Sequence, residues 1–593
     1  MDTRLEPLKQ KFRKVIALDA EFIESAPGAF PWRVVCFCWK DLLSGEEGRA
    51  WHTEFTSEPP FPIDETAVIV SYNATAEIMA MRSVGWPDPV HVLDLYVEHL
   101  NSINGLDRDL LGISGKDQSE RRKAGLLDAM AARGLSGISR EEKSDTIALI
   151  LSGGPWSPED RQQILDYCAS DVVALERLLP SMIGEIEGRR KGVIGALGRG
   201  RYMRAVSTQL INGVPIDVDS YHLLQERREE IQLELIRRYD SIGVCDHLTF
   251  KEDRFRDYLM ANRLAWPGAD QGSPKLDSGT FKDMCRRYPE LEPIRQLRKT
   301  LGAFRRDSLA IGPDGRNHPK LWPFKTFTGR NAPSPSEAIF QRPKWQRFLI
   351  KPAEGRAFIT ADWSAQEVWC GAHLSRDRGL LDALGGGGDI YLKVAELAGA
   401  VPAGAIKDSH PVERGLWKVA LLGTNYGSSA QGLAGRTGES LTEAIDVQRR
   451  LAQLFPQHHA WAEDQLVNPP RGRISTPNGW QCDSRFLRPN VAMNWPVQAL
   501  GSEICRLACI VASERGMKLC ISVHDSLGIE CAAEDVEETL ARLSDAMSIA
   551  SRVILDGIEI PSEAAVAAYP DRYYEKDGAE MWRTVSEILG IAT

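Results

Sequence analysis

The sequence contains no long uninterrupted apolar run. No run of about 18 residues, the length that crosses a bilayer, occurs among its 593 residues. Low-complexity tracts and internal repeats are also missing, and the polar N-terminus leads directly into an expected strand, so no secretory signal is expected. We therefore expect a protein that has no membrane partner and works in the cytoplasm.

Cysteine is present, but not in a metal-binding or disulfide pattern. The 11 cysteines are scattered, and no CxxC pair stands near a second pair or a pair of histidines. Cys36 and Cys38 alternate along an expected strand. Reduced, mostly buried thiols are therefore favoured over a structural zinc site or a disulfide framework.

The chain also lacks the surplus of positive charge that is common in nucleic-acid-binding proteins. Its 72 Lys and Arg residues are outnumbered by 82 Asp and Glu residues, which gives a net charge of −10. This balance argues weakly against a nucleic-acid partner, but binding depends on where the charges lie. Basic residues gather locally at Arg295, Arg298, Lys299, Arg305 and Arg306.

A chain of this length is expected to form two to four domains, because single cores stop growing well below 593 residues. Residues 15–100 alternate short apolar runs with turns and helical stretches, as in an α/β domain. A helix is expected over about 157–190, with Ser157 as its cap and Pro158 in its first turn. The Gly- and Arg-rich segment 188–201 is the best candidate for a linker, and 218–310 reads as long polar helices.

Two groups of side chains near the N-terminus could form a metal site. Asp19 and Glu21 are two apart on an expected strand, so their carboxylates share one face. Such a pair favours Mg²⁺ or Mn²⁺, although a D-x-E triplet alone occurs often by chance. Tyr167 and Asp171 lie four apart, on one face of the helix after Ser157. A further carboxylate, Glu77, follows a third apolar run.

The second half contains two further acidic positions at expected strand ends. Residues 358–362 read as a strand that ends in Asp362 and breaks into a helix. Residues 519–531 read as two apolar strands joined at His524 and Asp525. If Asp525 faces Asp362, the two carboxylates again require divalent cations.

Two expected helices carry polar side chains at four-residue steps. Ser409 and Pro411 are expected to open a helix with Arg414, Lys418, Leu422 and Tyr426, which would present two cations to a polyphosphate and Tyr426 to a base or sugar. Taken alone, an ordinary basic amphipathic helix explains this pattern equally well. Asn494 and Gln498 form a similar pair on a helix over about 489–512. Their amides could donate to the minor-groove acceptors that all base pairs share.

Taken in order, these motifs resemble family A DNA polymerases, the DNA polymerase I type. The matching segments are TGR at 328–330, DWSAQE at 362–367, R-x3-K-x7-YG from Arg414 and VHDS from 523. The N-terminal motifs resemble the DEDD 3′–5′ exonucleases that have a tyrosine in the third motif. The resemblance implies an RNase H-like exonuclease domain over 1–195 and a right-hand polymerase domain over 196–593. Within the latter it implies a thumb at about 218–305, a palm with Asp362 and Asp525, and fingers at about 375–485.

The resemblance also assigns roles. Asp362 and Asp525 would hold two Mg²⁺ ions, as would Asp19, Glu21, Glu77 and Asp171 at the exonuclease site, with Mn²⁺ as a substitute. Lys418 would act as proton donor, and Tyr167 would position the nucleophile. The incoming dNTP would meet Arg414, Lys418, Leu422, Tyr426 and the steric gate Glu367. Primer–template DNA would meet Arg330, Asn494, Gln498 and His524.

Several positions depart from the family pattern. Glu77 stands where Asp is usual, which leaves Asp94 as an alternative ligand. Leu422 replaces an aromatic residue, and Ser526 replaces the last residue of HDE. No 5′-nuclease domain precedes the motifs, as in bacteriophage members, so a phage replicase acting in the host cytoplasm is our interpretation of the source. Accessory proteins are not specified.

Two other functions remain open at this point. The chain could be a 3′–5′ exonuclease whose degenerate polymerase region only grips DNA, or a purely structural DNA-binding protein. The combined presence of Asp362, Asp525, Arg414, Lys418 and Tyr426 argues against both, because a binding module does not need this set.

Overall fold

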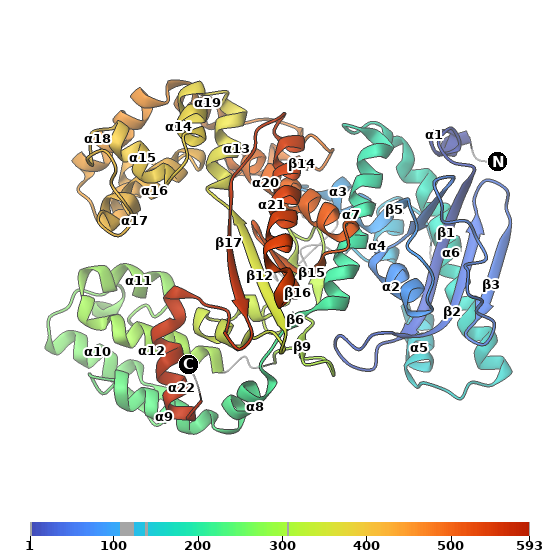
Figure 1. Ribbon diagram of the computed structural model, residues 1–593, viewed down its shortest axis with the longest axis horizontal. Helices are drawn as coiled ribbons and strands as arrows, with labels where there is room; N and C mark the ends of the chain where they lie inside the picture. Colours follow the sequence, from blue (N-terminus) through green and yellow to red (C-terminus); the bar gives the residue numbers. More distant parts are fainter. Residues whose placement is uncertain (1–2, 107–123, 137–139, 305–307, 592–593) are drawn as a thin grey trace.

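The computed structural model describes residues 3–106, 124–136, 140–304 and 308–591. Arg305 and Arg306 of the basic cluster lie outside the described residues. The chain forms an N-terminal α/β unit, a central sheet backed by helices, and two helical lobes that face each other beside that sheet (Figure 1). Within the described residues, no helix is both long and apolar enough to cross a membrane.

The N-terminal unit is built on a five-stranded sheet of order β3-β2-β1-β4-β5. Its strands are β1 Lys14–Ile23, β2 Arg33–Asp41, β3 Glu47–Trp51, β4 Ala67–Ser71 and β5 Val92–Asp94. In β1, Val15 and Ala17 pack into one core and Ile16 and Leu18 into another on the opposite face, because side chains alternate along a strand. Asp19 and Glu21 continue the face of Val15 and Ala17, as the sequence predicts.

Helix α6 (Pro158–Glu187) packs on that same face of the sheet, against β1 and β2. Its start follows the prediction: the hydroxyl of Ser157 accepts from the Asp160 amide at 3.1 Å, and the Asp160 carboxylate accepts from the Ser157 amide at 2.9 Å. This reciprocal pair satisfies two amides that would otherwise have no partner. The smaller helices of the unit are α2 Thr75–Ser83, α3 Leu95–Ile103, α4 Leu126–Ala131 and α5 Arg140–Leu151.

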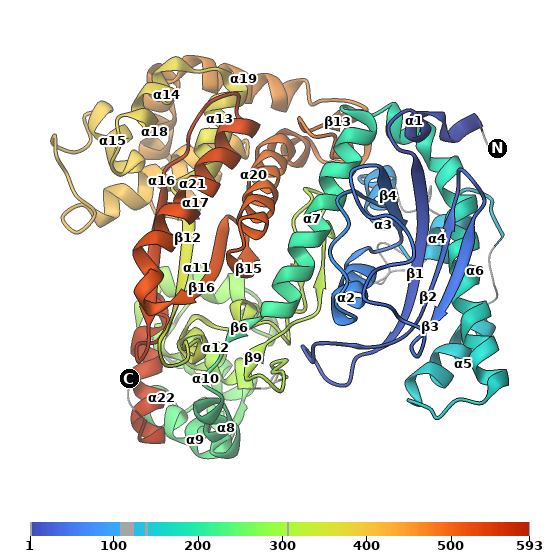
Figure 2. The ribbon, with the colours of Figure 1, turned by 45° about the vertical axis from the view of Figure 1, so that its right-hand side comes forward.

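The interpretation of residues 188–201 as a linker is wrong. Most of this segment lies in helix α7 (Gly192–Asn212), which runs between the N-terminal sheet and the central sheet (Figure 2). The expected domain boundary after residue 195 therefore falls inside a helix. Arg189 and Arg199, which looked like solvent-exposed linker residues, both pair with the buried carboxylate of Glu98 on α3.

The central sheet has the order β15-β16-β12-β17. Its strands are β12 Arg356–Trp363, β15 Lys518–Val523, β16 Ser526–Ala532 and β17 Ser562–Ala568. The hairpin predicted at His524 and Asp525 is confirmed, and so is the long helix after 489, which is α20 (Pro489–Glu514). Helix α20 and α21 (Val536–Ile554) cover one face of the sheet, and their apolar side chains form one core with Ala357, Ile359 and Ala361.

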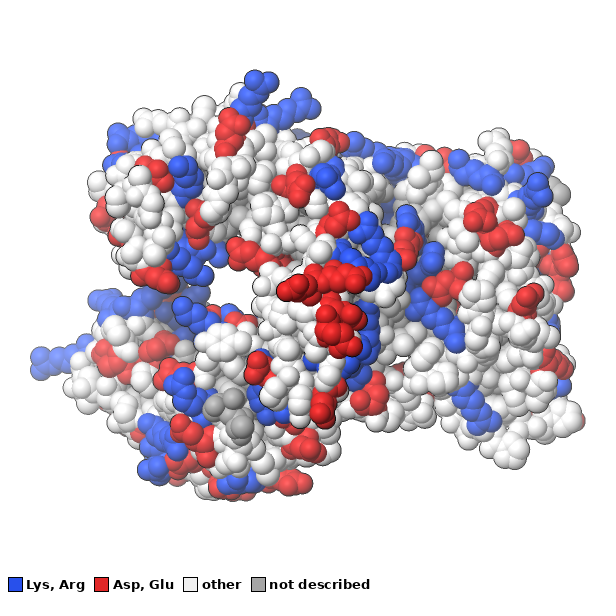
Figure 3. Space-filling model, in the orientation of Figure 1, with Lys and Arg blue, Asp and Glu red and all other residues white. Residues whose placement is uncertain are grey.

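Two lobes of helices lie beside the central sheet. The upper lobe comprises α13 Gln366–Ser375, α14 Arg378–Gly385, α15 Ile390–Leu397, α16 Pro411–Asn425, α17 Ala430–Thr437, α18 Leu441–Leu454 and α19 Pro456–Val467. The lower lobe comprises α8 Val218–Glu226, α9 Arg228–Tyr239, α10 Glu252–Ala261, α11 Ser278–Arg287, α12 Glu292–Phe304 and the C-terminal α22 Ala579–Leu589. An opening is visible between the two lobes (Figure 3). Arg286 of α11 bridges the lobes by donating to the main-chain oxygen of Gly435 on α17 at 2.8 Å.

Candidate active sites

The structure brings Asp362 and Asp525 together at one end of the central sheet. Asp362 stands near the end of β12, opposite Ser526 of β16 in the strand register, and Asp525 is the residue before Ser526. The Trp363 amide donates to the main-chain oxygen of Asp525 at 3.4 Å, which fixes the turn against β12. Partial burial raises the pKa of Asp362 to about 7, and the negative charge of Asp525 adds to the shift. Two carboxylates this close are the donor set that a divalent cation prefers.

Sequence reasoning missed a third carboxylate at this place. Glu563 of β17 is the register partner of Asp362 on the side opposite Ser526, and its charge also raises the pKa of Asp362. No motif surrounds Glu563 in the sequence. Only the pairing of β17 with β12 reveals it.

A hydrogen-bonded network joins residues from four of the predicted motifs. The hydroxyl of Tyr426 donates to the carboxylate of Glu367 at 2.9 Å, and the amide of Gln498 donates to that hydroxyl at 3.0 Å. The guanidinium of Arg330 lies 3.9 Å from Glu367. Burial raises the pKa of Tyr426, with a further contribution from Glu367, so the phenol is protonated and holds the Glu367 carboxylate in place.

The position of Arg330 depends on a tight turn. Gly329 has a φ of 82°, and a Cβ at this position would approach Arg506 Nη1 to 2.8 Å. Arg506 donates to the Gly329 oxygen at 2.7 Å, so the turn is held from α20. A glycine is required here both for the left-handed backbone and for this contact.

The two predicted cations of helix α16, Arg414 and Lys418, differ in their contacts. Arg414 pairs with the carboxylate of Asp389, which also caps α15, and its guanidinium lies over the ring of Tyr391. The Lys418 ammonium lies 5.5 Å from the centre of the same ring, and no ion pair of Lys418 occurs among the residues that the structure describes. Asp389 and Tyr391 were missed because no spacing rule links them to α16. The helix begins at Pro411 without a side-chain cap, so the expected role of Ser409 at its start is wrong.

Asn494 lies on α20, the helix that was predicted to carry it. It is buried, and its amide donates to the main-chain oxygen of Asn425 at 3.1 Å. Asn425 in turn donates to the Glu367 oxygen at 3.0 Å. Asn494 is therefore linked to the Glu367 main chain through Asn425, and its contact with DNA stays a prediction. His524 is exposed at the hairpin turn, with a φ of 55°.

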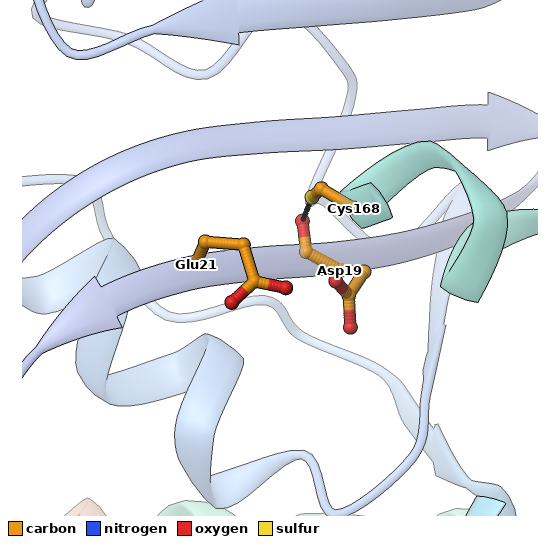
Figure 4. Close-up of side chains that lie close together, drawn as sticks. All are labelled: Asp19, Glu21 and Cys168. Atoms are coloured by element: carbon orange, nitrogen blue, oxygen red, sulfur yellow. Dashed lines mark hydrogen bonds between the residues drawn. The ribbon is translucent and has the colours of Figure 1, made fainter. Parts of the chain in front are cut away.

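The N-terminal carboxylates also form a cluster. Side-chain ligand atoms of Asp19, Glu21 and Cys168 lie within 4.8 Å of one another. Figure 4 shows that Cys168 approaches β1 from α6, and its thiol donates to the Asp19 main-chain oxygen at 3.4 Å. Burial raises the pKa of Asp19 well above its ordinary range, and the charges of Asp171, Glu21 and Glu77 add to this shift. The four carboxylates predicted to act together are therefore close enough to affect one another.

Glu77 fits a cation site better than Asp94 does. Glu77 is buried, and burial raises its pKa well above the ordinary range. Within the described part of the chain, Asp19 Oδ2 and Glu77 Oε2 are buried atoms without a hydrogen-bond partner, an arrangement that a bound cation would satisfy. Both oxygens of Asp94 instead accept main-chain amides, at Asn73, Ala74, Tyr96 and Val97, so Asp94 caps α3 and is not a substitute ligand.

Tyr167 and Asp171 face the sheet from α6, as predicted. Both are buried. Burial raises the pKa of Tyr167 above its ordinary value, and the charges of Asp171, Glu21 and Asp19 raise it further. The phenol is therefore protonated at neutral pH and available as a hydrogen-bond donor beside the carboxylates.

The arrangement of a central sheet between two helical lobes, with an RNase H-like α/β unit beside it, is that of a right-hand polymerase. The chain shares this fold with the solved structure "POL domain of Pol1 from M. smegmatis complex with DNA primer-template and dNTP", with a TM-score of 0.67 over 95% of this chain and 96% of that chain at 19% identity. The family model for DNA polymerase family A matches residues 315–568 of this chain.

The chain is also similar to curated DNA polymerases. The chain is 23% identical to DNA polymerase I of Aquifex aeolicus over 591 residues, which cover 89% of this chain and 98% of the relative. It is 26% identical to the thermostable DNA polymerase I of Thermus thermophilus over 424 residues, 67% of this chain but only 50% of the relative. It is also 26% identical to the Thermus aquaticus enzyme over 425 residues, 66% of this chain and 49% of that relative. The match therefore spans nearly all of the Aquifex relative and about half of the length of the two Thermus relatives.

Proposed function

We propose that this protein is a template-directed DNA polymerase that extends a primer 3′-end with dNTPs and proofreads with an N-terminal 3′–5′ exonuclease. The observation that carries the polymerase proposal is the meeting of Asp362 and Asp525 at the end of one sheet, in the segment that matches the family A model. The exonuclease proposal rests on the clustered carboxylates of Asp19, Glu21, Glu77 and Asp171. We place the exonuclease in residues 1–195 and the polymerase in 196–593, with α7 joining them.

The polymerase residues take separate roles in this proposal. Two divalent cations held by Asp362 and Asp525, Mg²⁺ in the first instance, would supply the charge stabilisation that phosphoryl transfer requires. Arg414 and Lys418 bind the triphosphate, and Lys418 gives its proton to the departing pyrophosphate. Because Arg414 already pairs with Asp389, the triphosphate competes with this carboxylate for the guanidinium.

The gate network selects the sugar. Glu367 occupies the space of a ribose 2′-hydroxyl, and its bonds to Tyr426 keep the carboxylate from moving aside. Arg330 and His524 contact the primer strand, and Gln498 reaches a base edge from the same network. Template–primer DNA and dNTPs are thus the proposed partners.

At the N-terminal site, Asp19, Glu21, Glu77 and Asp171 would hold the divalent cations for hydrolysis of the primer end. The protonated Tyr167 orients the attacking group by donating a hydrogen bond. Glu77 is one methylene longer than the Asp of the family pattern, and the burial of its side chain beside the other carboxylates supports its role as a ligand.

The proposal is tested with a 5′-labelled primer–template and Mg²⁺, with and without the four dNTPs. Asp525→Ala is expected to lose extension and keep primer shortening, while Asp19→Ala is expected to do the reverse, so each variant controls for the folding of the other. Shortening without extension in every protein would favour the alternative, a 3′–5′ exonuclease whose C-terminal part only grips DNA. Neither activity in the wild type would contradict both.

A further inference from the structure

Asp362 stands between two neighbouring strands that differ in chemistry. Its register partner on β16 is Ser526, and its partner on β17 is Glu563. Direct partners in antiparallel strands point to the same face and lie about 4.5–5.5 Å apart at Cβ. Glu563 and Ser526 therefore flank Asp362 at similar distances, on the face that carries the proposed polymerase site.

The side chain of Glu563 is also held in place. Ser364, in the turn that follows Asp362, donates its hydroxyl to Glu563 Oε1 at 3.2 Å, and its amide donates to the Pro561 oxygen at 2.8 Å. These two bonds tie the start of β17 to the end of β12. Among the described residues Glu563 has no ion pair with a Lys or Arg, so its charge is not neutralised by any of them.

The residue at position 526 gives the Glu563 carboxylate a possible role in metal binding. The family pattern at this turn is HDE, whereas this chain has His524, Asp525 and Ser526. A hydroxyl is a neutral and weak ligand, and divalent cations of the Mg²⁺ type prefer carboxylate oxygens. The loss of a negative charge on β16 is matched by the presence of one on β17, on the other side of Asp362.

We propose that Glu563 is the third carboxylate of the polymerase metal site and replaces, from the opposite neighbouring strand, the acidic residue that the family pattern has at 526. This inference rests on the proposed polymerase function and adds a ligand to it. It predicts that the affinity for divalent cation depends on Glu563, and that a carboxylate placed at 526 can substitute for it.

The test measures metal binding separately from activity. All proteins carry Asp19→Ala, which removes a ligand of the N-terminal site, and Mn²⁺ binding is followed by the loss of the free-ion EPR signal. We expect Glu563→Gln to weaken Mn²⁺ binding about 10- to 100-fold, the range measured when a group that supports a metal site is lost. Glu559→Gln, an exposed carboxylate 3.7 Å from Arg552, is the matched control and is expected to bind as the parent does.

The rescue variant makes the inference specific. Glu563→Ala with Ser526→Glu is expected to bind Mn²⁺ more tightly than Glu563→Ala alone and to extend a primer at lower Mg²⁺ concentration. Circular dichroism establishes that each variant is folded. Unchanged Mn²⁺ binding in Glu563→Gln, or a double variant no better than Glu563→Ala, would overturn the inference while primer extension by the parent still supports the proposed function. A parent that binds Mn²⁺ but never extends a primer would contradict the proposed function instead.

Discussion

At the residue scale, single positions of this chain depart from the pattern of the family A polymerases that it resembles. Leu422 lies one turn before Tyr426 on α16, half-buried against the main core, where the family has an aromatic residue. An aliphatic side chain has neither a ring to stack on the incoming sugar nor a hydroxyl to replace a missing 3′-OH. The chemical consequence is discrimination against sugars that lack that group.

We therefore expect the wild-type protein to use dideoxynucleotides poorly. Leu422→Tyr should increase the use of ddNTPs relative to dNTPs by at least about tenfold, which corresponds to about 1.4 kcal/mol of discrimination. Competition between ddTTP and dTTP in a single-turnover extension assay measures this ratio, with Leu422→Met as a control of similar volume and no hydroxyl. Equal use of ddTTP and dTTP by the wild type would contradict the prediction.

Asp362 makes the free energy of unfolding of the metal-free protein depend on pH. Its pKa is about 7 in the folded protein against an ordinary value of 3.8, so its protonated form stabilises the fold at low pH and this contribution is lost as pH rises toward 7. Asp362→Asn should therefore raise the free energy of unfolding in EDTA near pH 8, with little change near pH 4. Because the carboxyl remains accessible to solvent, we expect a gain on the order of 1 kcal/mol.

Urea unfolding followed by tryptophan fluorescence at several pH values measures this difference. The advantage of Asp362→Asn should grow between about pH 4 and pH 7 and stay constant above that range. An advantage that is largest at the acid end would contradict the assigned direction of the shift. Added Mg²⁺ should reduce the advantage, because the cation relieves the repulsion in the wild type.

At the element scale, α7 shows how a buried charge turns an apparent linker into part of the core. Glu98 on α3 is 1% exposed and pairs with Arg199 at 2.6 Å as well as with Arg189. Arg199 also donates to the main-chain oxygen of Asn478 at 2.7 Å, and Asn478 lies outside the N-terminal unit. The network thus joins the N-terminal unit to the loop between β13 (Arg473–Ser475) and β14 (Gln481–Asp483).

Removing the shared carboxylate should be costly. Glu98→Gln removes the counter-charge of the buried Arg199 guanidinium and leaves Arg189 with Glu185 alone. Loss of one partner of a buried ion pair typically destabilises a protein by about 3–5 kcal/mol. The expected result is a lower urea midpoint and a lower melting temperature. Arg201→Ala, which removes a solvent-exposed pair with Glu514, serves as the control and should cost less than about 1 kcal/mol. A Glu98→Gln protein as stable as Arg201→Ala would show that the network is not needed.

At the scale of the whole molecule, the two lobes meet across the opening beside the central sheet. The hydrogen bond from Arg286 to the Gly435 oxygen joins α11 to α17. Its acceptor is an uncharged main-chain carbonyl. Such a bond contributes about 0.5–1.5 kcal/mol, so it closes the lobes only weakly. Duplex DNA that enters between the lobes would have to break it.

Arg286→Ala should therefore accelerate the binding of primer–template by up to about fivefold, because the closed form loses about 1 kcal/mol. Stopped-flow fluorescence with a labelled duplex measures the association rate. Arg287→Ala is the matched control, since Arg287 lies over the Tyr288 ring and, in the part of the chain that the structure describes, forms no hydrogen bond or ion pair with α17. A slower association in Arg286→Ala would mean that this arginine mainly attracts DNA by its charge.

The sequence by itself determined the local elements and the pairs that they carry. The two-residue repeat of β1 fixed the shared face of Asp19 and Glu21, and four-residue spacing fixed the shared face of Tyr167 and Asp171 on α6. These relations follow from helix and strand periods, which depend only on neighbouring residues. The ordered motifs also predicted the fold class, which the shared fold confirms.

Only the tertiary structure decided which distant residues meet. Glu563 became part of the Asp362 site through the pairing of β17 with β12, and Cys168 reached Asp19 through the packing of α6 on the sheet. Asn494 and Asp94 have suitable chemistry for a site, but main-chain groups from other segments use their polar atoms. The physical reason is the same in each case: a hydrogen bond or a charge contact depends on distance in space, whereas the sequence pattern records only distance along the chain.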